Sequence, residues 1–218
     1  VHVGLFEIRV VVYTRRAYMF PGEQVVPHRS WSEEVGVLKG IFAGGDDFVF
    51  GGVEDKVHVY VLDSRREETG EVDFMELAMR GLDVRKMKRF EMRDGIKCHD
   101  LVVEQSGLGD LIGDKFEHNG YMFEPCGFSS NSILDKRYYT IHITPEESFS
   151  YVSFETNDTD IKREDTYESV VNYFKPKHTS FTIIADHSQF KDDFREEAVP
   201  FTRNLSIVYS YSLESSSG

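Results

Sequence analysis

The stretch from Tyr121 to Glu155 constrains the fold of this chain more than any other. It contains two short apolar runs, IHIT at 141–144 and YVSF at 151–154, on either side of the turn-forming residues PEES at 145–148. Runs of this length, rich in β-branched and aromatic residues and separated by a proline-containing turn, are typical of paired strands. The stretch therefore predicts an antiparallel hairpin with a loop of several residues.

Alternation along the first run gives the hairpin two different faces. Successive side chains of a strand point to opposite faces, so His142 and Thr144 share one face and Ile141 and Ile143 the other. An imidazole fixed in the middle of a strand is better oriented for chemistry than one on a loop. Glu146 follows the strand end and could reach a ligand lying over the rim.

The rest of the chain predicts several strands with few helices between them. Ser30 begins a helix with Glu33 three residues later, and Asp165 with Glu168 begins another, because both pairs fit helix N-termini. The segment 72–79 fits either a helix or a strand. The other predicted strands cover 5–14, 47–50, 57–62, 180–185 and 205–211, and the predicted helices cover 30–42, 83–90, 107–112 and 165–174.

Many strands in succession indicate an α+β fold with mainly antiparallel sheet. No linker-like stretch divides the chain, so we expect one domain over 1–218, with a mobile tail at 213–218. The chain opens with Val1 inside strand-like sequence. We therefore expect the domain to be incomplete at its N-terminus.

Composition and charge exclude several classes of protein. The formal net charge of −13 argues against nucleic acid as a partner, while an acidic surface suits cationic small molecules or serves solubility alone. Two cysteines are too few for a disulfide framework. No segment has the length and apolar character of a signal peptide or a membrane span. We expect a cytoplasmic protein without membrane contact.

Three long segments resemble the eukaryotic S-adenosylmethionine decarboxylases, with the plant-type enzymes most similar. They are YMFPGEQVVPHRSWSEEV at 18–35, PCGFSSNSI at 125–133 and YYTIHITPEESFSYVSFET at 138–156. The resemblance extends from about Arg9 to about Tyr209. It implies a four-layer αββα sandwich of two antiparallel sheets with helices on the outer faces, and it favours a strand at 72–79.

The resemblance also implies a cofactor and a reaction. Enzymes of this family cleave their own backbone before a serine and turn that serine into a pyruvoyl group, which forms a Schiff base with the substrate. The product is the aminopropyl donor for spermidine and spermine biosynthesis. The cleavage serine and the proton-donating cysteine of the family lie upstream of Val1. We therefore expect the upstream segment, or β chain, to be a partner, residues 1–218 alone to be inactive, and no metal to be needed.

Four residues match the family's active site. Ser129 and His142 correspond to the pair that transfers protons during self-cleavage. Phe123 corresponds to the aromatic that stacks on the adenine of S-adenosylmethionine, and Glu146 to the carboxylate that binds the ribose hydroxyls. Taken outside the motif, the same residues would be a structural serine, a strand histidine, a core aromatic and a turn acid.

A second group lies where the animal enzymes bind the activator putrescine. Val72 and Phe74 replace an aspartate and a threonine of the animal pattern. We expect the remaining carboxylates to be neutralised by an arginine, since a buried carboxylate requires a partner, and putrescine activation is therefore not expected. The predicted network comprises Thr14, Arg15, Glu76 and Glu155.

Other interpretations remain open at this stage. The chain could be a catalytically inactive regulatory paralogue or subunit of the decarboxylase, or a fragment without activity. Oligomeric state is open, with a homodimer as one option. Cys126 is expected to be a small buried hydrophobic residue, and the run 98–100 (CHD) is not expected to bind a metal because adjacent residues diverge. His178 and His187 are expected at the surface.

Overall fold

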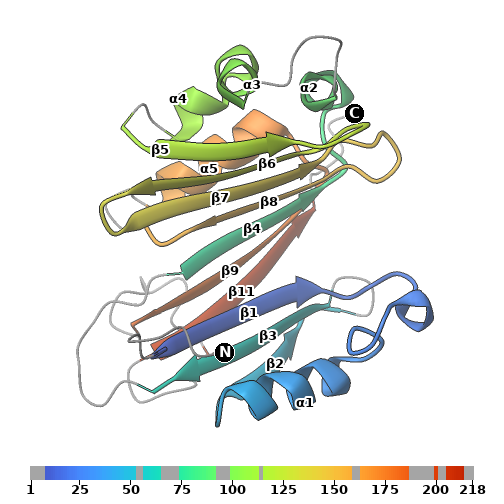
Figure 1. The fold of residues 1–218 in the computed structure, drawn as a ribbon, viewed down its shortest axis with the longest axis vertical. Coiled ribbons are helices and arrows are strands. Elements are labelled where there is room, and N and C mark those ends of the chain that lie inside the picture. Colours follow the sequence, from blue (N-terminus) through green and yellow to red (C-terminus); the bar gives the residue numbers. More distant parts are fainter. Residues whose placement is uncertain are drawn as a thin grey trace. The chain divides into compact units, whose positions relative to one another are not determined.

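The computed structural model describes residues 8–52, 56–64, 74–91, 99–112, 115–158, 163–186, 199–200 and 205–213. The chain forms two compact units (Figure 1). Unit 1 comprises Val1–Gly70 and Phe201–Arg203, and unit 2 comprises Glu71–Pro200 and Asn204–Gly218. The expectation of a single domain over 1–218 stays a prediction.

Unit 1 contains a three-stranded antiparallel sheet in the order β1-β3-β2. The central strand supplies its core, with Val59, Tyr60 and Val61 at most 1% exposed. The predicted hairpin of 47–50 and 57–62 is confirmed as the β2–β3 pair. The elements are β1 (Val10–Arg16), the short 3₁₀ helix η1 (Pro21–Glu23), α1 (Trp31–Ile41), β2 (Asp46–Phe50) and β3 (Val57–Asp63).

Helix α1 begins where its sequence predicts. The Ser30 hydroxyl accepts a hydrogen bond from the Glu33 backbone N–H at 3.2 Å, which satisfies one of the unpaired donors of the first turn. After the helix ends at Ile41, Gly45 turns the chain with a φ of +90°. A side chain at Gly45 would collide with the buried Tyr60 ring. The turn therefore requires glycine both for its positive φ and for the lack of space.

Unit 2 contains an eight-stranded antiparallel sheet in the order β10-β11-β9-β4-β8-β7-β6-β5. Its strands are β4 (Phe74–Arg80), β5 (Glu117–Met122), β6 (Phe128–Leu134), β7 (Arg137–Thr144), β8 (Tyr151–Thr156), β9 (His178–Asp186), β10 (Val199–Pro200) and β11 (Leu205–Leu213). Its helices are α2 (Val84–Met87), the 3₁₀ helix η2 (Lys88–Phe90), α3 (His99–Ser106), α4 (Leu108–Ile112) and α5 (Arg163–Phe174).

The helices of unit 2 cover one face of this sheet (Figure 1). The core between them joins Met87, Val102, Leu108 and Val170 from the helices to the apolar residues of the strands. On β7, the prediction of two faces is confirmed. Ile141 and Ile143 are 0% and 3% exposed in this core, whereas His142 and Thr144 are exposed on the opposite face.

Several predicted boundaries shift, and some elements were missed. Helix α5 begins at Arg163, two residues before Asp165, so placing the cap at Asp165 was wrong. Segment 72–79 is confirmed as a strand over its described part. The polar strands β5 and β6, the two-residue β10 and the helix α3 were not predicted. Of the expected mobile tail, Leu213 ends β11, while 214–218 lie outside the described residues.

Strands β5 and β6 carry few strand-forming residues. Glu117, His118, Asn119 and Gly120 open β5, and β6 contains three serines. Such sequences form strands because their neighbours and the covering helices hold them, which local propensity does not reveal. Strand β6 and the loop that joins it to β5 nevertheless line one cavity of unit 2.

Candidate functional site

One cavity of unit 2 brings together the four residues that the sequence singled out as an active site. Its volume is about 300 Å³. That lies at the lower end of the range found for pockets that bind small molecules. The lining residues are Phe123, Cys126, Gly127, Ser129, His142, Ile143, Thr144 and Glu146. Sequence positions 123 to 146 therefore converge on one place, although their roles stay predictions.

Ser129 and His142 form a hydrogen-bonded pair in this cavity. They are direct cross-strand partners in the β6–β7 ladder, and the Ser129 Oγ lies 2.8 Å from the His142 Nδ1. Both side chains lie on the sheet face opposite the helix-covered core, and His142 is exposed. A hydroxyl hydrogen-bonded to an accessible imidazole can pass a proton to a molecule in the cavity.

The loop between β5 and β6 holds Phe123 at the rim. The Phe123 N–H donates to the Gly127 carbonyl at 2.9 Å, and the Gly127 N–H donates to the Phe90 carbonyl at 3.1 Å. Gly127 has a φ of +119°, and an added Cβ would lie 3.4 Å from the Phe123 Cβ. Backbone bonds and a required glycine thus fix the loop, while the Phe123 ring remains 46% exposed.

Glu146 and Cys126 also line the cavity. Glu146 is exposed and begins the turn after β7, where the Phe149 N–H donates to its carbonyl at 3.1 Å. Cys126 is half-buried and lines the cavity, so the expectation of a buried hydrophobic residue was wrong. Burial raises the pKa of the Cys126 thiol, and the negative charges of Glu146 and Glu91 raise it further. The thiol is therefore protonated near neutral pH and is a poor nucleophile.

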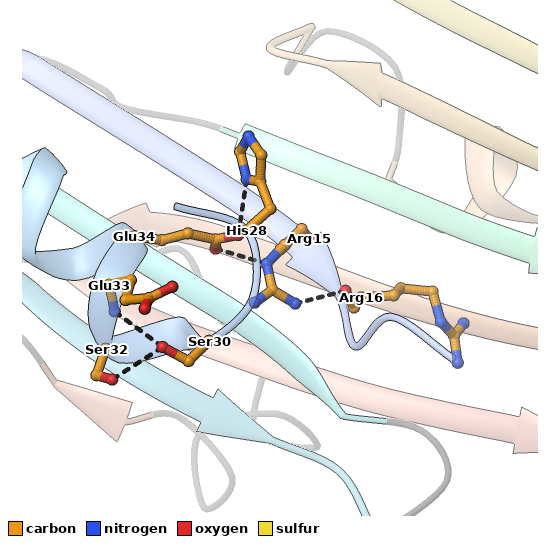
Figure 2. A network of polar contacts seen from close by, with 7 residues as sticks. All are labelled: Arg15, Arg16, His28, Ser30, Ser32, Glu33 and Glu34. Carbon is orange, nitrogen blue, oxygen red and sulfur yellow. Dashed lines mark hydrogen bonds and ion pairs between the residues drawn. The ribbon is translucent and has the colours of Figure 1, made fainter. Parts of the chain in front are cut away.

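The predicted charged network has a different set of contacts for Arg15. The Arg15 Nε lies 2.6 Å from the Glu34 Oε2, and these side chains are 11% and 3% exposed (Figure 2). The His28 Nδ1 lies 2.9 Å from the other Glu34 oxygen. The guanidinium also lies over the Tyr18 and Trp31 rings, at 4.8 and 5.6 Å from their centroids. Arg15 thus has a buried carboxylate partner within unit 1.

The sequence contained a signal for Glu34 that was not used. Glu34 is three residues after Trp31 and four before Leu38, so it lies on the same helix face as the predicted apolar stripe. A carboxylate in that position is buried and requires a cation. Arg15, on the neighbouring strand β1, supplies it.

Glu76 and Glu155 lie opposite each other in unit 2, as the β4–β8 register shows. The Tyr138 hydroxyl donates to the Glu155 Oε1 at 2.7 Å, a contact that sequence reasoning missed. Burial raises the pKa of Tyr138, and the charges of Glu155 and Glu76 add to the effect. Thr14 and Arg15 belong to unit 1, on β1. The pairing of Arg15 with the two carboxylates of unit 2 stays a prediction.

Comparisons with known proteins identify the family of this chain. The family model described as adenosylmethionine decarboxylase matches residues 1–216. The chain belongs to this family. It is 37% identical over 183 residues to the S-adenosylmethionine decarboxylase proenzyme of Dictyostelium discoideum. The aligned region covers 83% of this chain and 48% of the relative. The chain is also 37% identical over 196 residues to the proenzyme of Xenopus laevis, covering 86% and 56%.

The plant relatives are equally similar. Proenzyme 2 of Dianthus caryophyllus is 38% identical over 189 residues, which cover 83% of this chain and 50% of the relative. The chain therefore spans about half the length of the curated relatives it matches. The resemblance seen in the sequence is confirmed at the level of the family.

A solved structure shares the fold. The AdoMetDC-delta26 monomer of Trypanosoma brucei superposes with a TM-score of 0.70 at 22% identity, covering 97% of this chain and 87% of that chain. The likeness confirms the α+β fold class with antiparallel sheets. Within the described part of the chain, no helix is long and apolar enough to cross a membrane, and no group of three or more His, Cys, Asp or Glu is arranged to hold a metal ion.

Proposed function

We propose that this chain carries the substrate-binding and proton-transfer wall of an S-adenosylmethionine decarboxylase active site. The observation that carries the proposal is that Phe123, Ser129, His142 and Glu146 line one cavity, with the Ser129 Oγ 2.8 Å from the His142 Nδ1. Membership of the decarboxylase family supports it. An inactive regulatory paralogue is not favoured, since a regulator has no need for all four side chains in one accessible cavity.

The cavity has one group suited to the base of a nucleoside and another suited to its ribose. Phe123 presents an aromatic ring that is 46% exposed, which can stack on a purine and attract a neighbouring sulfonium. Glu146 presents an exposed carboxylate, which can accept hydrogen bonds from both hydroxyls of a ribose. Together they would orient the substrate and leave its amino acid portion toward Ser129 and His142.

The Ser129–His142 pair fits the formation of the family's pyruvoyl group. That group, when present, supplies an electrophilic carbonyl that accepts the electron pair left by decarboxylation. Self-cleavage at a serine requires proton transfer at a hydroxyl and a backbone carbonyl. With its Nδ1 bonded to Ser129, the His142 ring retains Nε2 for that exchange. The product would be decarboxylated S-adenosylmethionine, the aminopropyl donor for spermidine and spermine.

Two finer points belong to the same proposal. The upstream segment of the precursor would supply the cleavage serine, and residues 1–218 alone would not decarboxylate the substrate. Putrescine would not stimulate the enzyme, because the carboxylates Glu76 and Glu155 would already be neutralised. Carbon dioxide release by the purified 218-residue chain would contradict the first point, and stimulation of the full-length protein by putrescine would contradict the second.

The main test measures carbon dioxide release from carboxyl-labelled S-adenosylmethionine by the full-length protein. Glu146→Gln should raise KM, because a neutral amide binds the ribose hydroxyls less strongly than a carboxylate. The matched control is Glu147→Gln, the exposed neighbour that does not line the cavity. Absence of decarboxylation by the wild-type protein, or equal effects of the two substitutions, would contradict the proposal.

A further inference from the structure

A pair of exposed aromatic rings stands beside the cavity. Tyr121 and Phe123 are 65% and 46% exposed, their ring centroids are 4.9 Å apart, and their planes meet at 67°. This edge-to-face geometry is the preferred arrangement of two aromatic rings. Only Phe123 corresponds to a residue that the family motif assigns to the substrate, so Tyr121 has no role in the proposed function.

The register places Tyr121 on the same sheet face as the site. Tyr121 pairs with Ser129 across β5 and β6, and Ser129 pairs with His142 across β6 and β7. The three residues thus form one cross-strand row. Directly opposed side chains in adjacent strands have Cβ atoms about 4.5–5.5 Å apart. Tyr121 therefore stands one strand from the Ser129 hydroxyl.

Tyr121 contributes little to the core. Its strand packs on the helices through Met122, which is 6% exposed and faces the opposite side. Truncation of a largely exposed side chain leaves no cavity in the interior. The ring at position 121 is therefore not explained by stability, and its main contact of known geometry is the Phe123 ring.

The contact has a consequence for the orientation of Phe123. The backbone of residue 123 is fixed by the Gly127 bonds, but a half-exposed ring can still rotate about its side-chain torsions. An edge-to-face neighbour restricts that rotation. A ring held in its binding orientation before the ligand arrives loses less conformational entropy on binding, which increases affinity.

We propose that Tyr121 is a positioning residue, whose ring orients Phe123 for stacking on the planar base of the substrate. The inference rests on the proposed function, because it assigns Tyr121 to the same binding site. The aromatic ring of Tyr121 carries the effect, and its hydroxyl does not.

The test compares the affinity of 5′-methylthioadenosine for this chain and its variants by calorimetry. Tyr121→Ala should weaken binding about three- to tenfold, the range expected when an aromatic pair is lost. Tyr121→Phe should bind as the wild type does. Ile133→Ala is the matched control, since Ile133 is 54% exposed on β6, on the same face as Ser129 but four residues away. In the full-length enzyme, Tyr121→Ala should raise KM and leave kcat unchanged.

Each other outcome has a definite meaning. Wild-type affinity in Tyr121→Ala would overturn the inference and leave the proposed function intact. Equal weakening in Tyr121→Phe and Tyr121→Ala would assign the effect to the hydroxyl and overturn the role of the ring. A wild-type chain that does not bind the nucleoside would overturn both the inference and the proposed function. If Tyr121→Ala is unstable, Tyr121→Leu retains an apolar side chain without the ring and serves the same comparison.

Discussion

Two serine–histidine pairs in the described part of unit 2 are alike in geometry and different in surroundings. Ser129 Oγ lies 2.8 Å from His142 Nδ1, and Ser132 Oγ lies 2.8 Å from His118 Nδ1. Each pair joins neighbouring strands of the same sheet, β6 with β7 and β5 with β6. The two serines are three residues apart, so their side chains point to opposite faces of β6.

The surroundings of the two pairs separate their expected roles. Ser132 is 2% exposed on the helix-covered face, and His118 beside it is half-buried. Ser129 and His142 line the cavity on the other face. A buried polar pair satisfies its hydrogen bonds and stabilises the fold, whereas a pair at a cavity can exchange a proton with a ligand. Access to the pair, and not its hydrogen-bond length, therefore distinguishes the candidate site.

The largest expected effect is the loss of proton transfer at His142. In the full-length protein, His142→Ala should slow self-cleavage by roughly 100- to 10,000-fold, the usual contribution of general acid–base catalysis. The fold should persist, because an exposed strand residue leaves no interior cavity. Gel electrophoresis of precursor and products measures the rate.

His118→Ala is the matched control for this substitution. Because His118 lies on the helix-covered face, its removal should leave the rate of self-cleavage close to that of the wild type. If the two variants cleave at the same rate, access does not distinguish the two pairs and the role proposed for His142 is wrong.

In unit 1, a buried ion pair can be compared with an exposed one. Arg15→Ala leaves the carboxylate of Glu34, which is 3% exposed, without its cation, and should lower the free energy of unfolding by roughly 3–5 kcal/mol. The exposed pair of Lys39 and Asp47, 3.0 Å apart, provides the control. Lys39→Ala should cost less than about 1 kcal/mol. Urea denaturation measures both, and equal losses would show that Arg15 is not a buried partner.

The two serines predict a smaller difference in stability. Ser132→Ala removes a buried hydrogen bond and should lower the free energy of unfolding by about 1–3 kcal/mol. Ser129→Ala, at the accessible face, should change it by about 0.5 kcal/mol or less. Thermal or urea unfolding of the two variants, measured side by side, checks this order. A larger loss of stability in Ser129→Ala than in Ser132→Ala would contradict the assignment of Ser132 and His118 as the structural pair.

The smallest expected effect concerns the pKa of Cys126. Burial first, and then the charges of Glu146 and Glu91, raise this pKa, so the thiolate fraction at pH 8 is below that of an ordinary cysteine. In a Cys98→Ser background, alkylation by iodoacetamide should become fast only at a higher pH than for a free thiol. Glu146→Gln removes one negative charge, lowers the pKa and should speed alkylation at pH 8 a few-fold, while Glu147→Gln should not. Equal rates in all three proteins would mean that Glu146 does not act on Cys126.

The sequence predicted which side chains converge on one cavity better than it predicted the strands around them, and the roles of those side chains stay predictions. Alternation alone placed His142 opposite Ile141 and Ile143, because burying one face of a strand fixes the direction of every side chain on it. Phe123, Ser129 and Glu146, which the family motif singled out, line the same cavity. The edge strand β5 and its neighbour β6 were missed, since their serine, asparagine and glycine residues form strands only through pairing with neighbours.

Partners that depend on tertiary contact could not be predicted with the same success. The contact of Arg15 with Glu34 within unit 1 was not predicted, and the pairing of Arg15 with Glu76 and Glu155 stays a prediction. Tyr138 binds Glu155 across two strands, and His118 binds Ser132 across two others. The His118–Ser132 pair depends on the register of two strands that were not recognised. The Arg15–Glu34 and Tyr138–Glu155 pairs depend on how separately predicted elements pack together, which the linear sequence leaves open.

The most direct test of the account follows the ring signals of His142 and His118 in one NMR spectrum while 5′-methylthioadenosine is added. If the cavity binds the nucleoside, the His142 signals should shift with ligand concentration and saturate, while the signals of His118 on the helix-covered face should stay in place. Shifts confined to His118, equal shifts of both rings, or an unchanged His142 at a saturating concentration of ligand would contradict the account.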